Sequence, residues 1–347
     1  MKPLDTVCAL PVPRRTLVTG ATGFVGSAVA RCLLANGFNL RLLHRKDALL
    51  DNLEGIDAER ITGDLCDARS LRIAMAGCDA LFHVAADYRL WARQPRALYR
   101  TNVKGSAALL RAAAGAGVGR VVYTSSVAVL HAGMDGSVAD EQTPVTLGEM
   151  VGHYKRSKYL AEQAVHAVAA ELGMQVVTVN PSTPIGPRDI KPTPTGKIIV
   201  DAAKGLIPVY VDTGLNVVHV DDVAEGHLQA FWHGTPGRRY VLGGENMPFV
   251  KILRLVAQRI GRRVPKIRLP HAAVWPIALI AEGWARLRRS DQEPLATLDG
   301  VRMSMKRMYF SSARAREELG YRPRPATQAI DDALDWFAKN GYLDSAS

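Results

Sequence analysis

Tyr154 and Lys158 lie four residues apart in the stretch GHYKRSKYLAE. In a helix this spacing places both side chains on one face. A tyrosine can act as a general acid or base, but its phenol has an ordinary pKa of about 10 and keeps its proton at neutral pH. A nearby ammonium favours the phenolate. The pair therefore suggests proton transfer, although the same spacing also arises by chance in amphipathic helices.

Other polar residues that could work with this pair follow an apolar run. Ser125 and Ser126 end the run GRVVYTSS, which has the composition of a buried strand. Open α/β sheets bind ligands at the carboxyl ends of their strands, so these hydroxyls would face a ligand. Asn102, in TNVKG, falls in the helical stretch before that run. Each residue alone could simply end a strand or face solvent, but together they indicate one catalytic centre.

A glycine-rich turn precedes these residues in the chain. LVTGATGFVG places Gly20, Gly23 and Gly26 between an apolar run and a helical stretch. Such glycines allow a tight turn and close approach of the backbone to a pyrophosphate, which the helix N-terminus then binds. The order strand, turn, helix, strand predicts a dinucleotide site, with further predicted contacts at Thr22, Phe24 and Val25.

The choice of cofactor is normally made at the end of the second strand. A carboxylate there bonds the ribose hydroxyls of NAD, whereas an arginine accepts the 2′-phosphate of NADP. LLHRKDA has His44 at the expected acidic position and Arg45 next to it. The sequence therefore favours NADP(H), with NAD as the alternative if Asp47 or Asp64 binds the ribose. Asp64 and Leu65 would end the third strand and contact the adenine.

These side chains need a parallel sheet to bring them together. Short β-branched runs alternate with helical segments, which predicts a Rossmann-type doubly wound α/β sheet. The predicted strands are 15–20, 39–45, 59–65, 79–86, 119–126 and 174–182, and the predicted helices are 24–37, 95–117 and 150–172.

A smaller mixed α/β lobe is expected after the proline-rich stretch that begins at Pro181. We assign 14–182 to the dinucleotide domain, with 214–235 returning to it, and 183–213 with 236–325 to a substrate lobe. Residues 1–13 are expected to be a disordered lead-in. The candidate substrate contacts come from both parts: Asp87, Tyr88, Trp91, Ser126, Arg188, Lys191 and Tyr210.

Composition places the chain among ordinary globular proteins. Its 347 residues are 48% hydrophobic and 22% charged, and they carry a net charge of +11. Residues 251–325 hold 17 Lys and Arg against 6 Asp and Glu, so the positive charge is local. That surface could attract anionic lipid or phosphorylated ligands, or it could be a solvated face.

The cysteines and the N-terminus bear on the compartment. None of the four cysteines forms a CxxC pair, which favours small buried thiols in a reducing compartment and no metal site. The first residues lack the apolar core of a signal peptide, so we expect a cytoplasmic protein.

The motifs TGATGFVG, HVAA, NVKG, YTSS, YKRSK and NPS occur in this order. They resemble the extended (atypical) short-chain dehydrogenase/reductases of the NAD-dependent epimerase/dehydratase superfamily over residues 14–340. FHVAADYRLWARQP, VNPSTPIGPRDIKPTPTGKIIVDAAKG and VYVDTGLNVVHVDDVAEGH resemble more narrowly the hopanoid-associated sugar epimerase family, often labelled dihydroflavonol 4-reductase-like.

The resemblance implies roles for the individual residues. Tyr154 would be the general acid/base, Lys158 would favour its phenolate and bind the cofactor ribose, and Ser126 would hold the reacting oxygen. Asn102 would fix the local backbone and a water. Further implied contacts to the cofactor are Ala85, Ala86, Thr124, Pro181, Ser182 and Thr183. The helices at 95–117 and 150–172 resemble those that form a four-helix homodimer interface in relatives.

Several functions remain open at this point. An epimerase keeps its cofactor, whereas a carbonyl reductase releases it oxidised after each turnover. A dehydratase is disfavoured because TSSVAVL lacks the acidic pair after the serine, and a non-catalytic sensor is disfavoured because Tyr154 and Lys158 are both present. Residues 271–289 are apolar with two tryptophans and end in arginines, which could be an interfacial membrane helix or a packed helix. No nucleic-acid recognition motif is visible.

Overall fold

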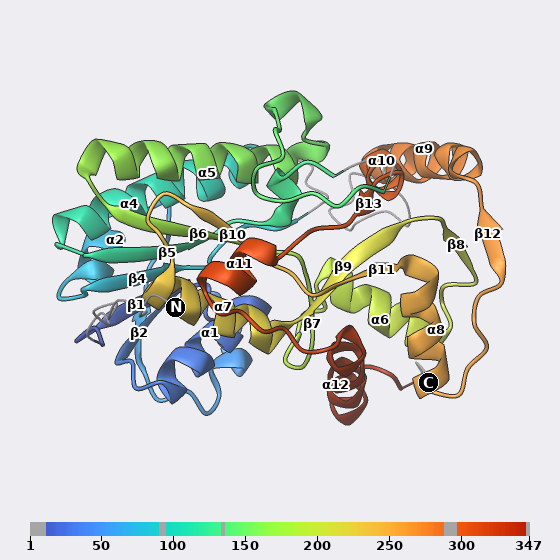
Figure 1. Ribbon diagram of the computed structural model, residues 1–347, viewed down its shortest axis with the longest axis horizontal. Helices are drawn as coiled ribbons and strands as arrows, with labels where there is room; N and C mark the ends of the chain where they lie inside the picture. Colours follow the sequence, from blue (N-terminus) through green and yellow to red (C-terminus); the bar gives the residue numbers. More distant parts are fainter. Residues whose placement is uncertain (1–11, 90–94, 133–135, 288–296, 345–347) are drawn as a thin grey trace, which may run out of the picture.

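The computed structural model describes residues 12–89, 95–132, 136–287 and 297–344. Figure 1 shows a larger part that contains the N-terminal strands and a smaller part that ends in α9 and β12. The first 11 residues lie outside the described part, and so does most of the predicted lead-in. No helix in the described ranges is long and apolar enough to cross a bilayer.

The larger part is built on a seven-stranded parallel sheet in the order β10-β6-β5-β4-β1-β2-β3. All neighbouring pairs in this sheet are parallel, so the predicted doubly wound fold is confirmed. Val18, Phe82 and Val122 on the central strands are fully buried, as expected for strands covered on both faces. The strands are β1 (Thr16–Thr19), β2 (Leu40–His44), β3 (Glu59–Thr62), β4 (Ala80–His83), β5 (Arg120–Thr124), β6 (Gln175–Pro181) and β10 (Arg239–Leu242).

Helices cover both faces of this sheet. On one face α1 (Phe24–Ala35) and α7 (Val220–His233) pack on each other and on the strands, with Phe38, Phe82 and Phe231 in edge-on and tilted contact. The other face is covered by α2 (Ala68–Met75), α4 (Ser106–Gly115) and α5 (Gly152–Leu172). The predicted helix 95–117 consists of α3 (Arg96–Tyr99), the π-helical segment η2 (Arg100–Gly105) and α4. Short 3-10 turns occur at η1 (Asp51–Leu53), η3 (Val127–Val129) and η4 (Leu147–Glu149).

The smaller lobe has its own sheet and core. In its sheet β9 (Gly214–His219) pairs with β7 (Thr183–Ile185), β11 (Glu245–Pro248) and β13 (Arg307–Met308). The helices α6 (Pro194–Lys204), α8 (Phe249–Arg259) and α12 (Ala326–Lys339) enclose a separate apolar core. A second pair, β8 (Val209–Val211) and β12 (Ile267–Leu269), leads to α9 (His271–Leu287) and α10 (Leu298–Ser304).

Two segments belong to the opposite part from the one predicted. The strand at 214–219 pairs within the smaller lobe, and only the following helix α7 packs on the main sheet. Conversely, β10 falls inside the segment 236–325 that we assigned to the lobe, yet it extends the main sheet beside β6. It packs with α11 (Ala313–Glu318). Both runs are only four to six residues long, and nothing in such a run shows which sheet it joins.

The cysteines of the described part are unpaired, but they do not share one environment. Cys78 is buried and Cys32 is half-buried, whereas Cys66 is exposed. The expectation that all three are small buried residues is therefore wrong for Cys66, which lies in the loop after β3.

Candidate active site

The glycine loop leaves no room for side chains. Gly20 has a φ of 76°, and a Cβ there would lie 2.7 Å from the backbone nitrogen of Ala85. A Cβ on Gly26 would lie 2.0 Å from the carbonyl oxygen of Gly20. Helix α1 begins directly after Gly23, with no side chain capping its first N–H groups. The loop therefore offers free backbone donors to an anion in the way that a pyrophosphate requires.

The end of β2 presents an exposed arginine beside the loop after β3. Arg45 is 69% exposed at its side chain, and its Nε lies 3.8 Å from a carboxylate oxygen of Asp47, which is also exposed. His44 Nδ1 lies 3.0 Å from the Arg45 carbonyl oxygen. Asp64 accepts a hydrogen bond from the Cys66 amide at 2.7 Å, and Leu65 is buried. Because the Arg45 guanidinium is solvated and only weakly paired with Asp47, it can bind a ligand phosphate.

The catalytic tyrosine candidate lies in the first turn of α5, facing the end of β5. Its hydroxyl is in hydrogen-bonding contact with Ser126. The Ser126 oxygen accepts from the Ala128 amide at 3.1 Å, so its own proton is available to donate to the phenol oxygen. Burial raises the pKa of Tyr154, and the Ser126 hydrogen bond acts in the opposite direction. In the protein without a cofactor, burial therefore has the larger effect on the pKa of Tyr154. The net shift favours the protonated phenol and not the expected phenolate.

The lysine of the pair is buried beneath the end of β5. Lys158 Nζ donates to the Thr124 carbonyl oxygen at 2.9 Å and lies 3.5 Å from the Tyr123 hydroxyl. Its ammonium also lies 5.1 Å from the centroid of the Tyr123 ring. Burial lowers the pKa of Lys158 to about 8, while the neighbouring Glu162 raises it. Lys158 can thus change charge near neutral pH, which an exposed lysine does not.

Asn102 joins the loop after β4 to the catalytic helix. Its Nδ2 donates to the Asp87 carbonyl at 2.9 Å and to Ser157 Oγ at 3.0 Å, and its Oδ1 accepts from the Asp87 amide at 2.8 Å. Ser157 in turn donates to the Tyr154 carbonyl at 2.8 Å. Asn102 lies in the π-helical segment η2, and such segments often occur at functional sites. These contacts support the expected backbone-fixing role.

Polar atoms without partners occur at the carboxyl ends of β5 and β6. Within the described residues, Ser125 Oγ, Ser182 Oγ and Asn180 Oδ1 are buried and have no hydrogen-bond partner. Buried orphan hydroxyls are costly unless a ligand satisfies them. Ser182 follows the end of β6, and Thr183 begins β7, at the crossing between the two sheets. Together with the glycine loop, these groups fit a bound nicotinamide dinucleotide.

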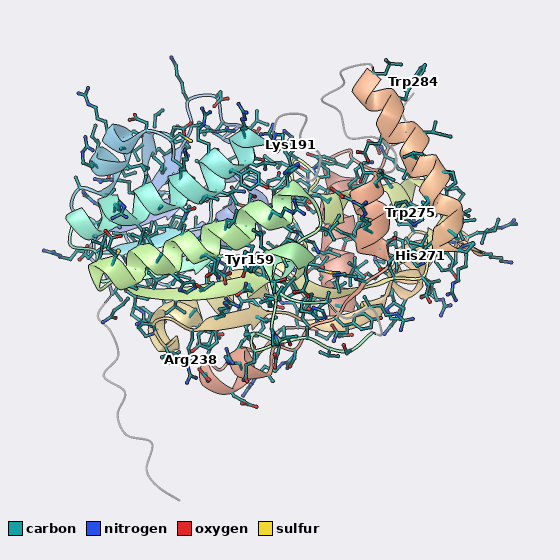
Figure 2. The ribbon with its side chains drawn as sticks, turned by 90° about the horizontal axis from the view of Figure 1, so that it is seen from above. Tyr159, Lys191, Arg238, His271, Trp275 and Trp284 are labelled. Atoms are coloured by element: carbon teal, nitrogen blue, oxygen red, sulfur yellow. The ribbon has the colours of Figure 1, made fainter. Side chains whose placement is uncertain are left out.

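The candidate substrate residues do not all gather at the site. Arg188 has a φ of 74° and forms an ion pair with Asp221 at the start of α7. Because its guanidinium already has this partner, Arg188 is not free to bind a substrate phosphate. Asp87 pairs with Arg89 at 2.5 Å. Tyr210 lies on β8 in the small two-stranded sheet. Lys191 is exposed (Figure 2), Tyr88 is 43% exposed, and Trp91 lies outside the described residues.

Several charged residues near α5 lie outside the site predicted from the sequence. Glu162, one turn after Lys158, is buried and binds Arg239 of β10 at 2.7 Å. His131 and Glu149 form a pair at 2.8 Å on the two loops before α5. Burial and the nearby Lys306 lower the pKa of Lys155 to about 8. The spacing of Glu162 from Lys158 was a usable signal, since i and i+4 share a face, but Arg239 is distant in sequence.

The chain combines a half-buried Tyr154, a buried Lys158 and a dinucleotide-type glycine loop. Its family and relatives are NAD(P)-dependent dehydrogenases, reductases and epimerases, and the protein is an enzyme of this class. The chain belongs to the NAD dependent epimerase/dehydratase family, whose model matches residues 16–243.

Individual relatives match over nearly the whole chain. A "Putative dihydroflavonol 4-reductase" of Synechocystis sp. is 44% identical over 331 residues, covering 94% of this chain and 95% of that protein. "Sterol demethylase protein B" of Methylococcus capsulatus is 33% identical over 328 residues, covering 94% of this chain and 99% of that protein. Among solved structures, the crystal structure of gox2253 has a TM-score of 0.86 at 49% identity, covering 95% of this chain and all of that one.

Proposed function

We propose that the protein is an NAD(P)-dependent oxidoreductase or epimerase that interconverts a secondary hydroxyl and a ketone on a sugar-like or hopanoid-related substrate. The observation that carries this proposal is the position of Tyr154 and Lys158 on one face of α5, with Lys158 Nζ held on the Thr124 carbonyl at 2.9 Å and Ser126 acting on the Tyr154 phenol from the end of β5. Proton transfer requires a titratable group at the reacting oxygen, and Tyr154 is the group at the sheet edge that fits.

The proposed mechanism assigns one task to each side chain. Tyr154 accepts the proton of the substrate hydroxyl during oxidation and returns it during reduction. Ser126 orients the reacting oxygen, since its proton can turn from the phenol toward the substrate. Lys158 holds the cofactor ribose, because its ammonium is anchored on the Thr124 carbonyl at 2.9 Å. A bound nicotinamide supplies the hydride acceptor or donor at the carbon that carries this oxygen.

We propose NADP(H) as the preferred cofactor. The exposed guanidinium of Arg45 at the end of β2 supports this choice, because it can bind a 2′-phosphate. Replacing Arg45 with Glu should weaken NADPH binding by at least about tenfold and leave NADH binding unchanged or improved. Fluorescence titration with both nucleotides measures this, and Arg69→Glu, at an exposed position of α2, is a matched charge reversal.

A second candidate is an NADPH-dependent carbonyl reductase. The name of the Synechocystis relative, dihydroflavonol 4-reductase, describes an activity of this kind. The same exposed Arg45 supports it, because NADPH is the usual reductant in such reactions. The two candidates differ in what happens to the nucleotide. Protein purified with a tightly held nucleotide that survives turnover supports the epimerase, and stoichiometric consumption of NADPH supports the reductase.

The central test removes the phenol hydroxyl alone. Tyr154→Phe should lower turnover of any accepted substrate by about a hundredfold or more, because general acid/base catalysis contributes this much, while nucleotide affinity changes little. Tyr159→Phe is the matched control, five residues further along α5 (Figure 2), and should keep activity. Equal turnover of Tyr154→Phe and wild type with every substrate would refute the proposal.

Of the two proposed substrate classes, we favour the hopanoid-related one, which is largely apolar. The name of the Methylococcus relative refers to sterols, and Tyr88, which follows β4, has a ring that can pack on a polycyclic body. A panel of sugar nucleotides, sterols and hopanoid alcohols, screened for nucleotide absorbance change, distinguishes these classes. We further propose a cytoplasmic location, where unpaired thiols such as exposed Cys66 stay reduced.

A further inference from the structure

Lys155 is a buried cation to which the proposed mechanism assigns no task. It follows Tyr154 directly in the first turn of α5, and it is only 9% exposed. Among the described residues, no carboxylate or other hydrogen-bond acceptor is paired with its ammonium. Because it is costly to take a charged amine out of water without a partner, a lysine in this position is expected where a ligand supplies the missing negative charge.

The charged group that acts on Lys155 is a second lysine, from the smaller lobe. Burial and the charge of Lys306, which directly precedes β13, lower the pKa of Lys155 to about 8. Lys306 is half-buried, and none of the described residues forms an ion pair with it. Helix α5 has no side-chain cap at Val151 and no acidic residue in its first turn. Lys155 and Lys306, the lysine pair, thus lie at the positive end of a helix dipole, an arrangement that attracts an anion.

Two acidic residues of the smaller lobe lie near the lysine pair, and arginines already bind both. Asp299 of α10 faces the start of α5, since a Cβ on Gly152 would lie 2.9 Å from its Oδ2. The Oδ1 of Asp299 lies 3.3 Å from Arg302 Nη1. Asp212 Oδ2 lies 3.3 Å from Nη2 of Arg307, the residue that follows the second lysine. These carboxylates therefore do not neutralise the lysine pair.

The lysine pair lies where the two parts of the molecule meet. Tyr159, one turn after Lys155 on the same side of α5 (Figure 2), packs in one apolar cluster with η3 and with Met308 of β13. Ser126, which acts on the Tyr154 phenol, directly precedes η3. The glycine loop follows β1, which lies two strands away from β5 in the sheet. The lysine pair is therefore close to the proposed reacting oxygen, whereas the cofactor pyrophosphate is expected elsewhere.

We propose that Lys155 and Lys306 bind an anionic oxygen group of the substrate, a carboxylate or a phosphate, close to the hydroxyl or ketone on which Tyr154 acts. This inference rests on the proposed function and adds one requirement: the otherwise apolar substrate carries a negative charge near its reacting carbon. Charge-assisted hydrogen bonds from two ammonium groups fix that carbon in one position. They also select against an uncharged analogue, which leaves the cations without a partner.

The first experiment measures anion binding without turnover. The protein is saturated with NADPH or NADH, whichever binds more tightly, so that the glycine loop is occupied. It is then titrated by calorimetry with inorganic phosphate, with cyclohexanecarboxylate and with uncharged cyclohexanol. We expect saturable binding of at least one anion and none of cyclohexanol, and the anion that binds more tightly identifies the class of the substrate group. If neither anion binds to the wild-type protein, the proposal is wrong.

Charge-removing variants assign this binding to the lysine pair. Lys155→Met and Lys306→Met should each weaken anion binding at least about tenfold, and Lys155→Arg should keep most of it. Lys251→Met, at an exposed lysine of α8, is the matched control and should bind the anion like wild type. Without ligand, Lys155→Met should unfold at the same or a higher temperature than wild type, because it loses an unpaired buried cation. Unchanged anion binding with a lower unfolding temperature would mean that Lys155 is structural, and the proposal would be wrong.

Turnover separates this inference from the proposed function. Lys155→Met should raise KM at least about tenfold for an anionic substrate and leave KM unchanged for its uncharged ester. Tyr154→Phe should lower the turnover of both compounds but still bind the probe anion. An equal effect of Lys155→Met on both compounds, or a wild-type enzyme that accepts only uncharged substrates, overturns the inference while the proposed function stands. Full activity of Tyr154→Phe refutes the proposed function, whatever the anion titrations give.

Discussion

At the scale of single residues, the backbone packing around Gly26 allows the sharpest prediction. A Cβ there would meet the Gly20 carbonyl oxygen at 2.0 Å, and a backbone atom cannot rotate away. Gly26→Ala should therefore lower stability by about 1–3 kcal/mol and weaken nucleotide binding at least about tenfold, because the phosphate loop must shift. Thermal unfolding and nucleotide titration measure both effects.

Gly115→Ala is the control for this prediction. A Cβ at Gly115, the last residue of α4, meets nothing within 4 Å. The substitution should leave nucleotide binding unchanged and alter stability by less than about 1 kcal/mol, in the stabilising direction. A fully active and equally stable Gly26→Ala protein would contradict the tight packing of the loop.

The lowered pKa of Lys158 predicts a pH dependence of cofactor binding. Burial brings the pKa of Lys158 to about 8, so the ammonium is charged below this pH and neutral above it. If the charged form binds the ribose, nucleotide affinity should fall by up to about tenfold per pH unit above pH 8 and stay constant well below it. Isothermal titration at several pH values measures this.

Two variants identify the group that titrates. Lys158→Arg should give affinity that no longer depends on pH in this range, because arginine stays charged. Lys155→Met should keep the dependence, although the pKa of Lys155 is also lowered to about 8 by burial. If the pH dependence of nucleotide affinity disappears with Lys155→Met and persists with Lys158→Arg, the titrating group is Lys155 and the prediction is wrong.

At the scale of elements, β10 is attached to the catalytic helix through one buried carboxylate. Glu162 Oε1 lies 2.7 Å from Arg239 Nε, and Asn180 Nδ2 lies 3.4 Å from Glu162 Oε2. Glu162→Gln keeps the shape but leaves the half-buried guanidinium without a counter-charge, which should cost about 2–4 kcal/mol. Urea unfolding measures the loss, with Gln163→Ala on the exposed side of α5 as the control.

The same variant has a second expected effect. Since Glu162 raises the pKa of Lys158, its neutralisation should move the pH midpoint of nucleotide binding below 8. If the variant loses stability but the pH midpoint of nucleotide binding does not change, Glu162 stabilises the contact with β10 and does not affect the pKa of Lys158.

The elements also show where sequence analysis succeeds and fails. Most strands between 15 and 182 are predictable because they centre on apolar, β-branched runs, and β1 to β6 all lie within the predicted ranges. The exception is β3, whose four residues Glu59–Thr62 include only one aliphatic side chain and are mostly exposed. The sheet assignments of β9 and β10 were not predictable, since their partners depend on contacts between distant segments. At the site, the positions of Tyr154 and Ser126 at one sheet edge followed from the order of the elements. The anchoring of Lys158 on a main-chain carbonyl did not, because no side-chain pattern encodes it.

At the scale of the whole molecule, the two long helices on the outer face of the sheet are expected to form a homodimer interface. Helices α4 and α5 lie side by side (Figure 1), and the Arg111–Glu171 ion pair at 2.7 Å links their ends. Ala167 is exposed on α5, and Ala108 and Ala112 on α4 are half-buried, so these helices carry small side chains that permit close approach of a second pair of helices.

The dimer is testable by placing one charge in this surface. Ala167 is exposed on α5, so Ala167→Arg should fold normally but raise the dimer dissociation constant at least about tenfold, because each protomer then carries a buried unpaired charge into the interface. Light scattering coupled to size exclusion measures the state. Ala338→Arg, also at an exposed helical alanine but on α12, should leave the dimer intact. A wild-type protein that is monomeric at all concentrations would show that the α4–α5 face has another role.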